Sequence, residues 1–171
     1  MLQTMLKLRT GSLDDVERIA KLQLASWRVT YAAELSRALL ENQDVADWAD
    51  DWRRCMAAGE RVILAEDGDA LAGFVACGPA RGATTADAEW EIYNIHVAPD
   101  LHGRGIGGKL LEAAAALGRE YGARQLVLWV VETNQTARRF YESKGMRWDG
   151  GAQDAPMETE MLHEVRYRRV L

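Results

Sequence analysis

The sequence predicts a mixed α/β domain, because segments with strand and helix patterns alternate along its 171 residues. Short apolar runs bounded by glycine or aspartate indicate strands, whereas apolar residues three and four positions apart indicate helices. The length suits one hydrophobic core, so we expect residues 1–171 to form a single domain.

The first half of the chain opens with a strand over 6–10 and a helix from about Leu13 to Trp27. Ser12 suits the N-cap of that helix, and Asp14 and Asp15 favour its first turn. The other elements expected here are one or two helices over 35–58 ended by Gly59, a hairpin of strands 61–66 and 71–77 around Asp67-Gly68-Asp69, and a loop over 78–88.

The second half alternates more regularly between strands and helices. Its expected elements are a strand over 89–97, a helix over 107–121, a buried strand over 126–131, a helix over 133–144 closed by Gly145, and strands over 146–148 and 165–170 joined by a loose loop. The full order is therefore β-αα-ββ-β-α-β-α-β-β.

Composition narrows the classes of function. A formal net charge of −5 argues against a nucleic-acid partner and is compatible with a cationic substrate. Cys55 and Cys77 stand apart from each other and from any histidine cluster, so we expect no metal site and a reduced, cytoplasmic protein. Because no apolar stretch approaches the ~20 residues that cross a bilayer, we expect no membrane association.

A glycine-rich turn over 97–111 (VAPDLHGRGIGGKLL) joins the expected strand 89–97 to the next helix. Glycines let the backbone approach a ligand, and the amides that open a helix carry unpaired donors at the positive end of its dipole. This segment is typical of a phosphate-binding turn, although the same glycines would also serve a tight strand-to-helix connection alone.

Two common phosphate motifs fit this turn poorly. Gly103, Gly105 and Gly108 match GxGxxG, but four residues separate the strand from the first glycine and too little chain follows for a large parallel sheet. Residues 103–109 match GxxxxGK, but the next residue is Leu110, which lacks the hydroxyl that binds magnesium in a P-loop.

The run HGRGIG from His102 resembles the acyl-CoA pyrophosphate loop of the GNAT superfamily, commonly (Q/R)xxGx(G/A). Gly105 and Gly107 match that pattern, and His102 replaces the usual Gln or Arg. The loop residues that the resemblance assigns to acyl-CoA are His102, Gly103, Arg104, Gly105, Ile106, Gly107 and Gly108.

A second segment, NQTARRFYESKGM over 134–146, resembles the family's NxxAxxFYxxxGF motif. Asn134, Ala137 and Tyr141 share one helix face, on which Asn134 would bond the pantetheine arm and the small Ala137 would let it pass. In the other interpretation the helix is simply amphipathic, and in either case we expect Phe140 in the core. Residues 25–31 (ASWRVTY) resemble the W-R-x-x-Y stretch of many uncharacterised members.

The resemblance implies a GNAT-like fold: a mostly antiparallel sheet of six to seven strands with a splayed central pair, flanked by about four helices. It also implies acetyl-CoA as co-substrate, without a metal, and direct acetyl transfer to a primary amine in a ternary complex. The backbone of Ile95, His96 and Val97 would pair with the pantetheine beside a β-bulge, and the Ile95 amide would donate to the thioester carbonyl.

Alkyl amines have a pKa of about 10, so a base must deprotonate the acceptor before it attacks. The resemblance places this base at Glu91, although Glu89 lies on the same strand face and remains an alternative. Tyr141 is the candidate acid for the departing thiolate. His96 falls on the opposite face by strand alternation, so we interpret it as a structural residue and a backbone contact.

The acceptor is expected to be a small amine such as a polyamine, an amino acid or an amine antibiotic. Trp27, Tyr31 and Trp90 are candidates to line its site, whereas Trp48 and Trp52 at helical spacing favour the core. A protein N-terminal or lysine acetyltransferase is one alternative, and a non-catalytic acyl-CoA-binding module is another. The C-terminal segment EVRYRRVL would offer an edge for a homodimer.

Overall fold

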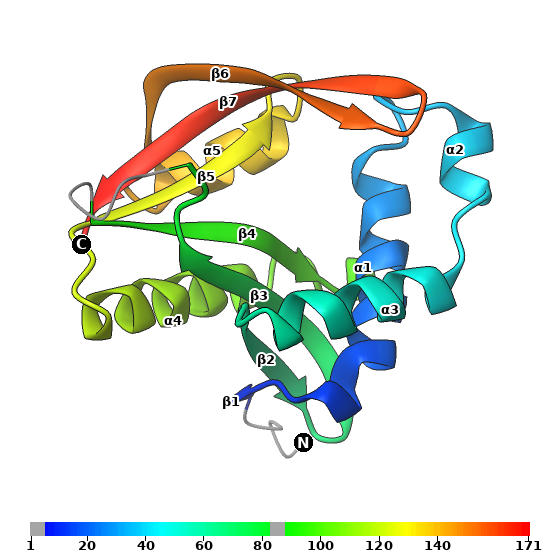
Figure 1. Ribbon diagram of the computed structural model, residues 1–171, viewed down its shortest axis with the longest axis horizontal. Helices are drawn as coiled ribbons and strands as arrows, with labels where there is room; N and C mark the ends of the chain where they lie inside the picture. The colour runs from blue at the N-terminus through cyan, green and yellow to red at the C-terminus, as the bar shows by residue number, and fades with distance from the viewer. Residues whose placement is uncertain (1–5, 83–87) are drawn as a thin grey trace. The chain divides into compact units, whose positions relative to one another are not determined.

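The computed structural model describes residues 6–82 and 88–171. Within these ranges, seven strands form a sheet in the order β1-β2-β3-β4-β5-β7-β6, and five α-helices accompany it (Figure 1). The strands are β1 (Lys7–Thr10), β2 (Arg61–Asp67), β3 (Ala70–Pro79), β4 (Glu89–Val97), β5 (Gln125–Val131), β6 (Arg147–Met157) and β7 (Glu160–Val170). The helices are α1 (Val16–Thr30), α2 (Arg37–Glu41), α3 (Val45–Ala57), α4 (Ile106–Glu120) and α5 (Gln135–Ser143), with single 3-10 turns η1 (Leu13–Asp15) and η2 (Pro99–Leu101).

The sheet is mixed, as the sequence predicted. Strands β1, β2 and β3 pair antiparallel, and so do β5 with β7 and β7 with β6. β4 and β5 are parallel, with Glu89 opposite Gln125 and Ile92 opposite Leu128. Such a parallel pair needs a crossover connection, and α4 lies within it.

The chain divides into two compact units, one of Met1–Cys77 with Asn94–Ala114 and the other of Gly78–Tyr93 with Ala115–Leu171. The first unit has a core between α1, α3 and the β2-β3 hairpin. Its buried members are Val16, Ile19, Ala20, Leu22, Ala49, Trp52, Val62, Leu64, Phe74 and Ala76, and Trp48 packs against them. The expectation that Trp48 and Trp52 belong to the core is therefore confirmed.

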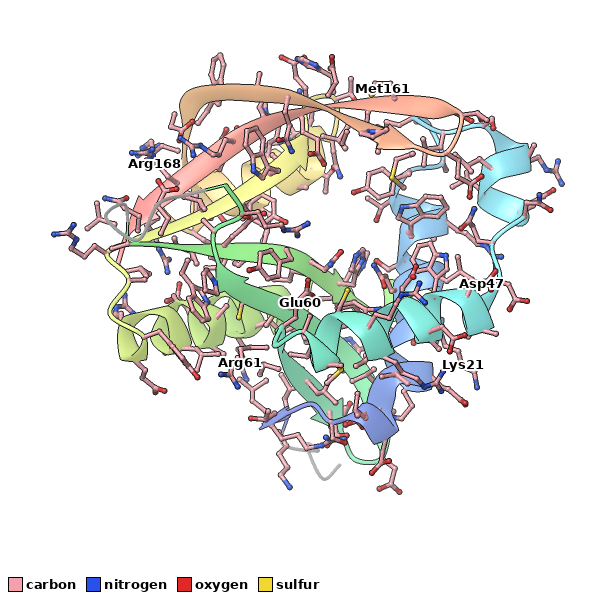
Figure 2. All side chains as sticks on the ribbon, viewed as in Figure 1. Lys21, Asp47, Glu60, Arg61, Met161 and Arg168 are labelled. Carbon is pink, nitrogen blue, oxygen red and sulfur yellow. The ribbon has the colours of Figure 1, made fainter. Side chains whose placement is uncertain are left out.

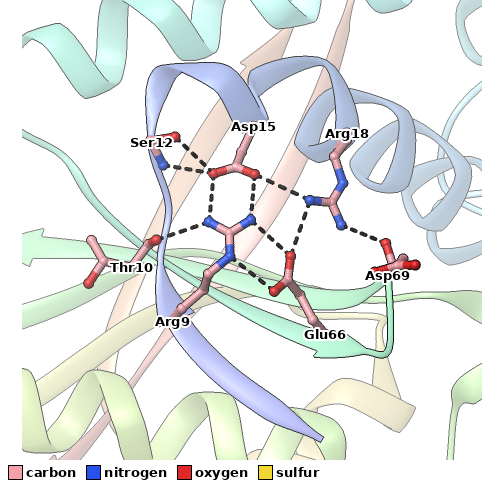
Figure 3. A network of polar contacts seen from close by, with 7 residues as sticks. All are labelled: Arg9, Thr10, Ser12, Asp15, Arg18, Glu66 and Asp69. Carbon is pink, nitrogen blue, oxygen red and sulfur yellow. Dashed lines mark hydrogen bonds and ion pairs between the residues drawn. The ribbon is translucent and has the colours of Figure 1, made fainter.

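The start of α1 is fixed by a partly buried ionic network in the first unit (Figure 3). Asp15 accepts the N–H of Ser12 at 2.9 Å, as in a capping box, and two guanidinium bonds from Arg9 at 2.8 and 2.7 Å. Glu66 of β2 accepts from both Arg9 and Arg18. The bonds from Arg9 hold the pKa of both carboxyl groups below their usual range, against the cost of burial.

The second unit packs its sheet against α5 and the end of α4. Tyr167 of β7 is fully buried, and its hydroxyl accepts from Arg138 at 3.0 Å and donates to Glu142 at 2.8 Å. Both partners lie on α5, so these bonds join that helix to the sheet. Phe140, expected in the core, is only half-buried, with Lys144 5.9 Å from its ring centroid.

The loose loop expected between the last two strands is wrong, because β6 and β7 form one long hairpin (Figure 1). The register shifts between Trp148 and Ala152, where Gly150 adopts a φ of 90°. This bulge interrupts the alternation that would have revealed the strand. Pro156 also obscured it, although an edge strand such as β6 tolerates proline.

The interpretation of the C-terminal strand as a sheet edge is also wrong. β7 pairs with β5 on one side and with β6 on the other, so its backbone groups are used by both neighbours. Met161, at the turn end of β7, is 60% exposed, and Arg168 lies towards the other end of the same strand (Figure 2). The terminal strand on this side of the sheet is β6.

The expected loop over 78–88 corresponds only in part. Gly78 and Pro79 still belong to β3, and Ala80 donates its N–H to the carbonyl of Glu89 at 3.1 Å. Residues 83–87 lie outside the described part of the chain. Over the ranges that are described, no helix combines the length and the apolar character needed to cross a membrane.

Candidate functional site

The glycine turn between η2 and α4 is open and left-handed at two positions. Gly103 and Gly105 have φ angles of 78° and 79°, a region that favours glycine. No atom lies within 4 Å of the position that a Cβ would take at either residue. The backbone of this turn is therefore accessible, and the conformation explains why glycine occupies both positions.

Helix α4 begins directly after this turn. Lys109 donates its backbone N–H to the carbonyl of Gly105 at 3.2 Å, which makes it the first amide bonded within the helix. The preceding amides of Ile106, Gly107 and Gly108 belong to the first turn, whose N–H groups lack intrahelical acceptors. Together with the helix dipole they form a donor set suited to a phosphate or pyrophosphate.

The side chain of His102 supports the turn from outside. Its Nε2 lies 3.0 Å from the carbonyl oxygen of Val97, which ties the exposed imidazole to the end of β4. The neighbouring Arg104 is exposed and adds a positive charge to the same turn. His102 thus has a structural role in this unit, whatever its part in ligand binding.

Polar side chains of α1 contact the last residues of β4. Gln23 accepts from the indole of Trp52 at 2.7 Å and donates to Asn94 at 3.4 Å. Ser26, which is buried, lies with its Oγ 3.0 Å from Nδ1 of His96. The imidazole also packs against Phe74, with ring centroids 5.5 Å apart, and burial of the ring lowers its pKa to about 4. His96 is therefore neutral at pH 7.

Gly73 of β3 also shapes this region. A Cβ there would lie 2.8 Å from the carbonyl oxygen of His96 and 3.1 Å from Leu110 of α4. Ala98 donates its N–H to the carbonyl of Ala72 at 2.9 Å, just beyond this contact. The missing side chain thus lets β4 and the start of α4 lie close to β3.

Glu91 in the second unit is buried, with 5% of its surface exposed, and it is held by Arg81. Oε2 accepts the backbone N–H of Arg81 at 2.8 Å, and Oε1 lies 3.7 Å from Nε of the same residue. The guanidinium also covers the ring of Tyr93, with 4.3 Å between Cζ and the centroid. No sequence pattern predicted the contact between Arg81 and Glu91.

Glu89 has different surroundings from Glu91, although the two carboxylates are two residues apart. It lies 3.6 Å from Arg166 and 3.5 Å from Arg168, both on β7 (Figure 2 labels Arg168). These arginines also bind Asp149 at 2.7 and 2.9 Å. Burial disfavours ionisation of Asp149, but bonds from Gly151 and Arg168 keep the pKa of Asp149 below its usual value.

Trp90 points into the core of the second unit. It is 3% exposed and stacks on Tyr121, with 5.1 Å between the ring centroids. Its indole also fills the space beside Gly118, where an added Cβ would lie 2.8 Å from Cγ of Trp90. Trp90 is thus a packing residue of this unit.

The second predicted acyl-CoA segment forms the start of α5. Asn134 is the N-cap, and its Oδ1 accepts the N–H of Ala137 at 3.0 Å. A ligand would therefore bond to its NH₂ group or to the second lone pair of Oδ1. Tyr141 is buried, with 8% exposed, and its ring meets that of Phe140 edge-on at 5.2 Å.

The aromatic candidates on α1 lie together in the first unit. Trp27 is buried and packs edge-on against Tyr31 and Trp48, with ring centroids 5.9 and 5.3 Å apart. Tyr31 is half-buried at the end of α1. The structure thus collects Trp27 and Tyr31 in one unit with the glycine turn and the end of β4, whereas Glu91, Asn134 and Tyr141 belong to the other.

Comparison with known proteins identifies the family. The model of the acetyltransferase (GNAT) family matches residues 16–146. The chain belongs to this family. An uncharacterized N-acetyltransferase from Archaeoglobus fulgidus is 29% identical over 152 residues, which cover 83% of this chain and 93% of the relative. The chain is thus an N-acetyltransferase, and the prediction made from its two motifs is confirmed.

Solved structures share the fold of this GNAT chain. PaiA N-acetyltransferase from Thermoplasma acidophilum, in complex with coenzyme A, has a TM-score of 0.73 at 17% identity, covering 98% of this chain and 99% of PaiA. Nourseothricin acetyltransferase has a TM-score of 0.57 at 26% identity, covering 65% of each chain. Among the residues described for this member, no group of three or more His, Cys, Asp or Glu side chains could hold a metal ion.

Proposed function

We propose that this GNAT enzyme transfers the acetyl group of acetyl-CoA to the primary amine of a small molecule, directly within a ternary complex. The observation that carries the proposal is the turn before α4. It combines two left-handed glycines, open space above them and the unpaired amides of a helix start. A pyrophosphate fits this donor set, and a solved structure with the same fold contains coenzyme A.

The pantetheine arm would follow the end of β4. There the backbone of Ile95, His96 and Val97 would pair with its amides as an added strand does. The Ile95 amide would then donate to the thioester carbonyl.

From α5, the free donors of the Asn134 amide and the small side chain of Ala137 suit a thin acyl-CoA arm. Tyr141 would supply the proton that the sulfur needs on departure. The amine nitrogen would bond to the acetyl carbon while the carbon–sulfur bond breaks. The ammonium loses two protons in all. Glu91 would take one before the attack, and the other would leave the nitrogen as the amide forms and replace the proton that Tyr141 gives to the thiolate.

Glu91 is the better candidate base of the two carboxylates on β4. It pairs with the guanidinium and the backbone N–H of Arg81, whereas Glu89 shares a cluster with two arginines and Asp149. That cluster gives Glu89 a structural role in joining β4 to β7. A base must take a proton from an ammonium of pKa about 10, and Glu91 lies on the strand that also carries 95–97.

A small-molecule acceptor is supported by the 26% identity with nourseothricin acetyltransferase. Trp27 and Tyr31 would contribute an aromatic wall with attraction for a cationic amine. Trp90, buried beneath Gly118, is better explained by packing. The two cysteines, Cys55 and Cys77, are not joined in a disulfide, and a cytoplasmic enzyme is in keeping with this. The exposed edge of β6 would serve a homodimer.

A thermal melt with acetyl-CoA, compared with NADH and with ATP-magnesium, tests the cofactor. Ligand at ~100 times its dissociation constant stabilises by about 2.7 kcal/mol, which raises the midpoint by roughly 5 to 10 °C for a domain of this size. A rise with acetyl-CoA alone supports the proposal. A rise with NADH or ATP instead would contradict it.

Transfer is then tested by thiol release with a panel of amines. Glu91→Gln should lower turnover about 10²- to 10⁴-fold yet keep the melting shift, and Tyr141→Phe should reduce turnover more than binding. Asp149→Asn is the matched control, because it alters the neighbouring charge cluster without touching Glu91. If neither Glu91→Gln nor Tyr141→Phe slows transfer, the assigned roles are wrong. Acetyl-CoA binding without transfer to any amine or peptide would favour a non-catalytic module.

A further inference from the structure

The guanidinium of Arg81 lies beside Glu91 and Tyr93 in the second unit. Its Nε is 3.7 Å from Oε1 of Glu91, and its Cζ lies 4.3 Å from the centroid of the Tyr93 ring, while the backbone N–H of Arg81 bonds to Oε2 of Glu91. A long arginine side chain ordinarily samples many rotamers. Here a stacked ring and a carboxylate together restrict it.

The Tyr93 ring, over which the Arg81 guanidinium lies, is itself held in place. Tyr93 donates its hydroxyl to the carbonyl of Pro79 at 2.5 Å. A Cβ at Gly78 would lie 2.6 Å from the same hydroxyl oxygen, so the phenol occupies the space that a side chain at that position would fill. The Arg81 side chain nevertheless remains 64% exposed. A restrained guanidinium with an open outer side is suited to bind a planar anion.

Charge makes this arrangement selective. An acceptor ammonium that approaches Glu91 also approaches the Arg81 guanidinium, and like charges repel more strongly where the surroundings are partly desolvated. A purely cationic amine such as a polyamine carries no anionic group of its own that could offset this repulsion. An amine that carries its own carboxylate offsets it, because the carboxylate can bind Arg81 while the ammonium meets Glu91.

We propose that Arg81 is a specificity-determining residue that binds a carboxylate of the acceptor, so the preferred substrates are amino-acid-like zwitterions. This inference rests on the proposed function, since it takes Glu91 as the base. It narrows the acceptor class from small amines in general to those with an anionic group near the reacting nitrogen. Arg81 binds substrate in this scheme and takes no part in moving protons.

The test compares each amino acid with the amine left after its carboxylate is replaced by hydrogen, for example L-phenylalanine with phenethylamine and L-lysine with cadaverine. For wild-type enzyme and Arg81→Gln, kcat/KM is measured for both members of each pair by thiol release from acetyl-CoA. The ratio between the two enzymes cancels the intrinsic nucleophilicity of each amine. Arg119→Gln, at an exposed position of α4, is the control.

Arg81→Gln should lower kcat/KM for the carboxylate-bearing member about 10- to 100-fold, the range for a hydrogen bond between charged groups, and leave its partner unchanged or faster. Arg81→Lys should lie in between, because an ammonium keeps the charge without the planar fork. Arg119→Gln should change neither member. Calorimetric titration of the CoA-bound protein with the same pairs should show the same preference in affinity.

Equal losses for both members of every pair would overturn the inference while the proposed function stands. A wild-type preference for the decarboxylated amines would overturn it as well. If no member of any pair is acetylated although acetyl-CoA binds, the proposed function itself fails, and this inference fails with it.

Discussion

Replacement of Gly73 by alanine tests whether the fit of β3 against β4 controls acetyl-CoA binding. The new Cβ would lie 2.8 Å from the carbonyl oxygen of His96, whereas ordinary van der Waals contact begins at 3.4 Å. That oxygen must therefore move away by about 0.6 Å. The second neighbour, the Cδ1 of Leu110, is 3.1 Å away but ends a flexible side chain. The displacement therefore falls on the backbone of β4.

The cost follows from two opposing effects. Overpacking of a well-filled site destabilises by about 1–3 kcal/mol, whereas alanine gains about 0.4–1 kcal/mol over glycine by restricting the unfolded chain. A net loss of about 1–2 kcal/mol remains, equivalent to roughly 2–8 °C in the melting midpoint of a domain of this size. Because His96 lies within the segment proposed to pair with pantetheine, affinity for acetyl-CoA should also fall, by about tenfold for a shift of this size.

Both quantities are measured by melting and calorimetric titration of Gly73→Ala. Gly11→Ala is the control, since its Cβ would meet only side-chain atoms of β2, Val62 Cβ being nearest at 3.3 Å. The control should lose some stability and keep full affinity. If Gly73→Ala were destabilised but bound acetyl-CoA like the wild type, the end of β4 would not be the pantetheine site. Unchanged stability would refute the steric reasoning itself.

Three further predictions concern charge. Glu91→Gln should lower turnover about 10²- to 10⁴-fold, and a smaller loss in steady-state assays would exclude it as the base. The pKa of His96 is about 4 when folded and near 6.5 when unfolded, so the unfolded chain binds the extra proton. The free energy of unfolding should therefore fall by up to about 3 kcal/mol between pH 6.5 and 4, and His96→Gln should flatten that slope in urea titrations. Arg9→Met should cost about 2–3 kcal/mol at pH 7, because it leaves the buried Asp15 with only Arg18 as a cationic partner, and urea unfolding with no loss would refute this.

Local sequence signals predicted most of the secondary structure. The strand expected over 89–97 is β4 with the same bounds, and the cap at Ser12 and the glycine after α5 also lie where expected. Each of these features depends on residues adjacent in the chain. The hairpin of β6 and β7 was missed, because a bulge and a proline hid its alternation and its register depends on a distant strand.

The candidate site also combines local features, which the sequence predicted, with contacts between distant residues, which it did not. Glycines, caps and helix starts are local, so the turn before α4 and the cap at Asn134 could be predicted from motifs. The distinction between Glu89 and Glu91 could not be predicted. Glu89 pairs with arginines 77 and 79 residues away along the chain, and Glu91 pairs with an arginine 10 residues away. Contacts of this kind become visible only when strands are placed beside one another.

Three glycines show how such contacts set the strand that carries the site. A Cβ at Gly73 would meet the carbonyl of His96, one at Gly78 would meet the phenol of Tyr93, and one at Gly118 would meet the indole of Trp90. All three contacted residues belong to β4. Trp90 and Tyr93 lie on either side of Glu91 along the strand, and His96 lies within the 95–97 segment. A missing side chain has no periodicity and no charge, so its role emerges only from its partner. The position of the proposed base thus depends on glycines that no motif contains.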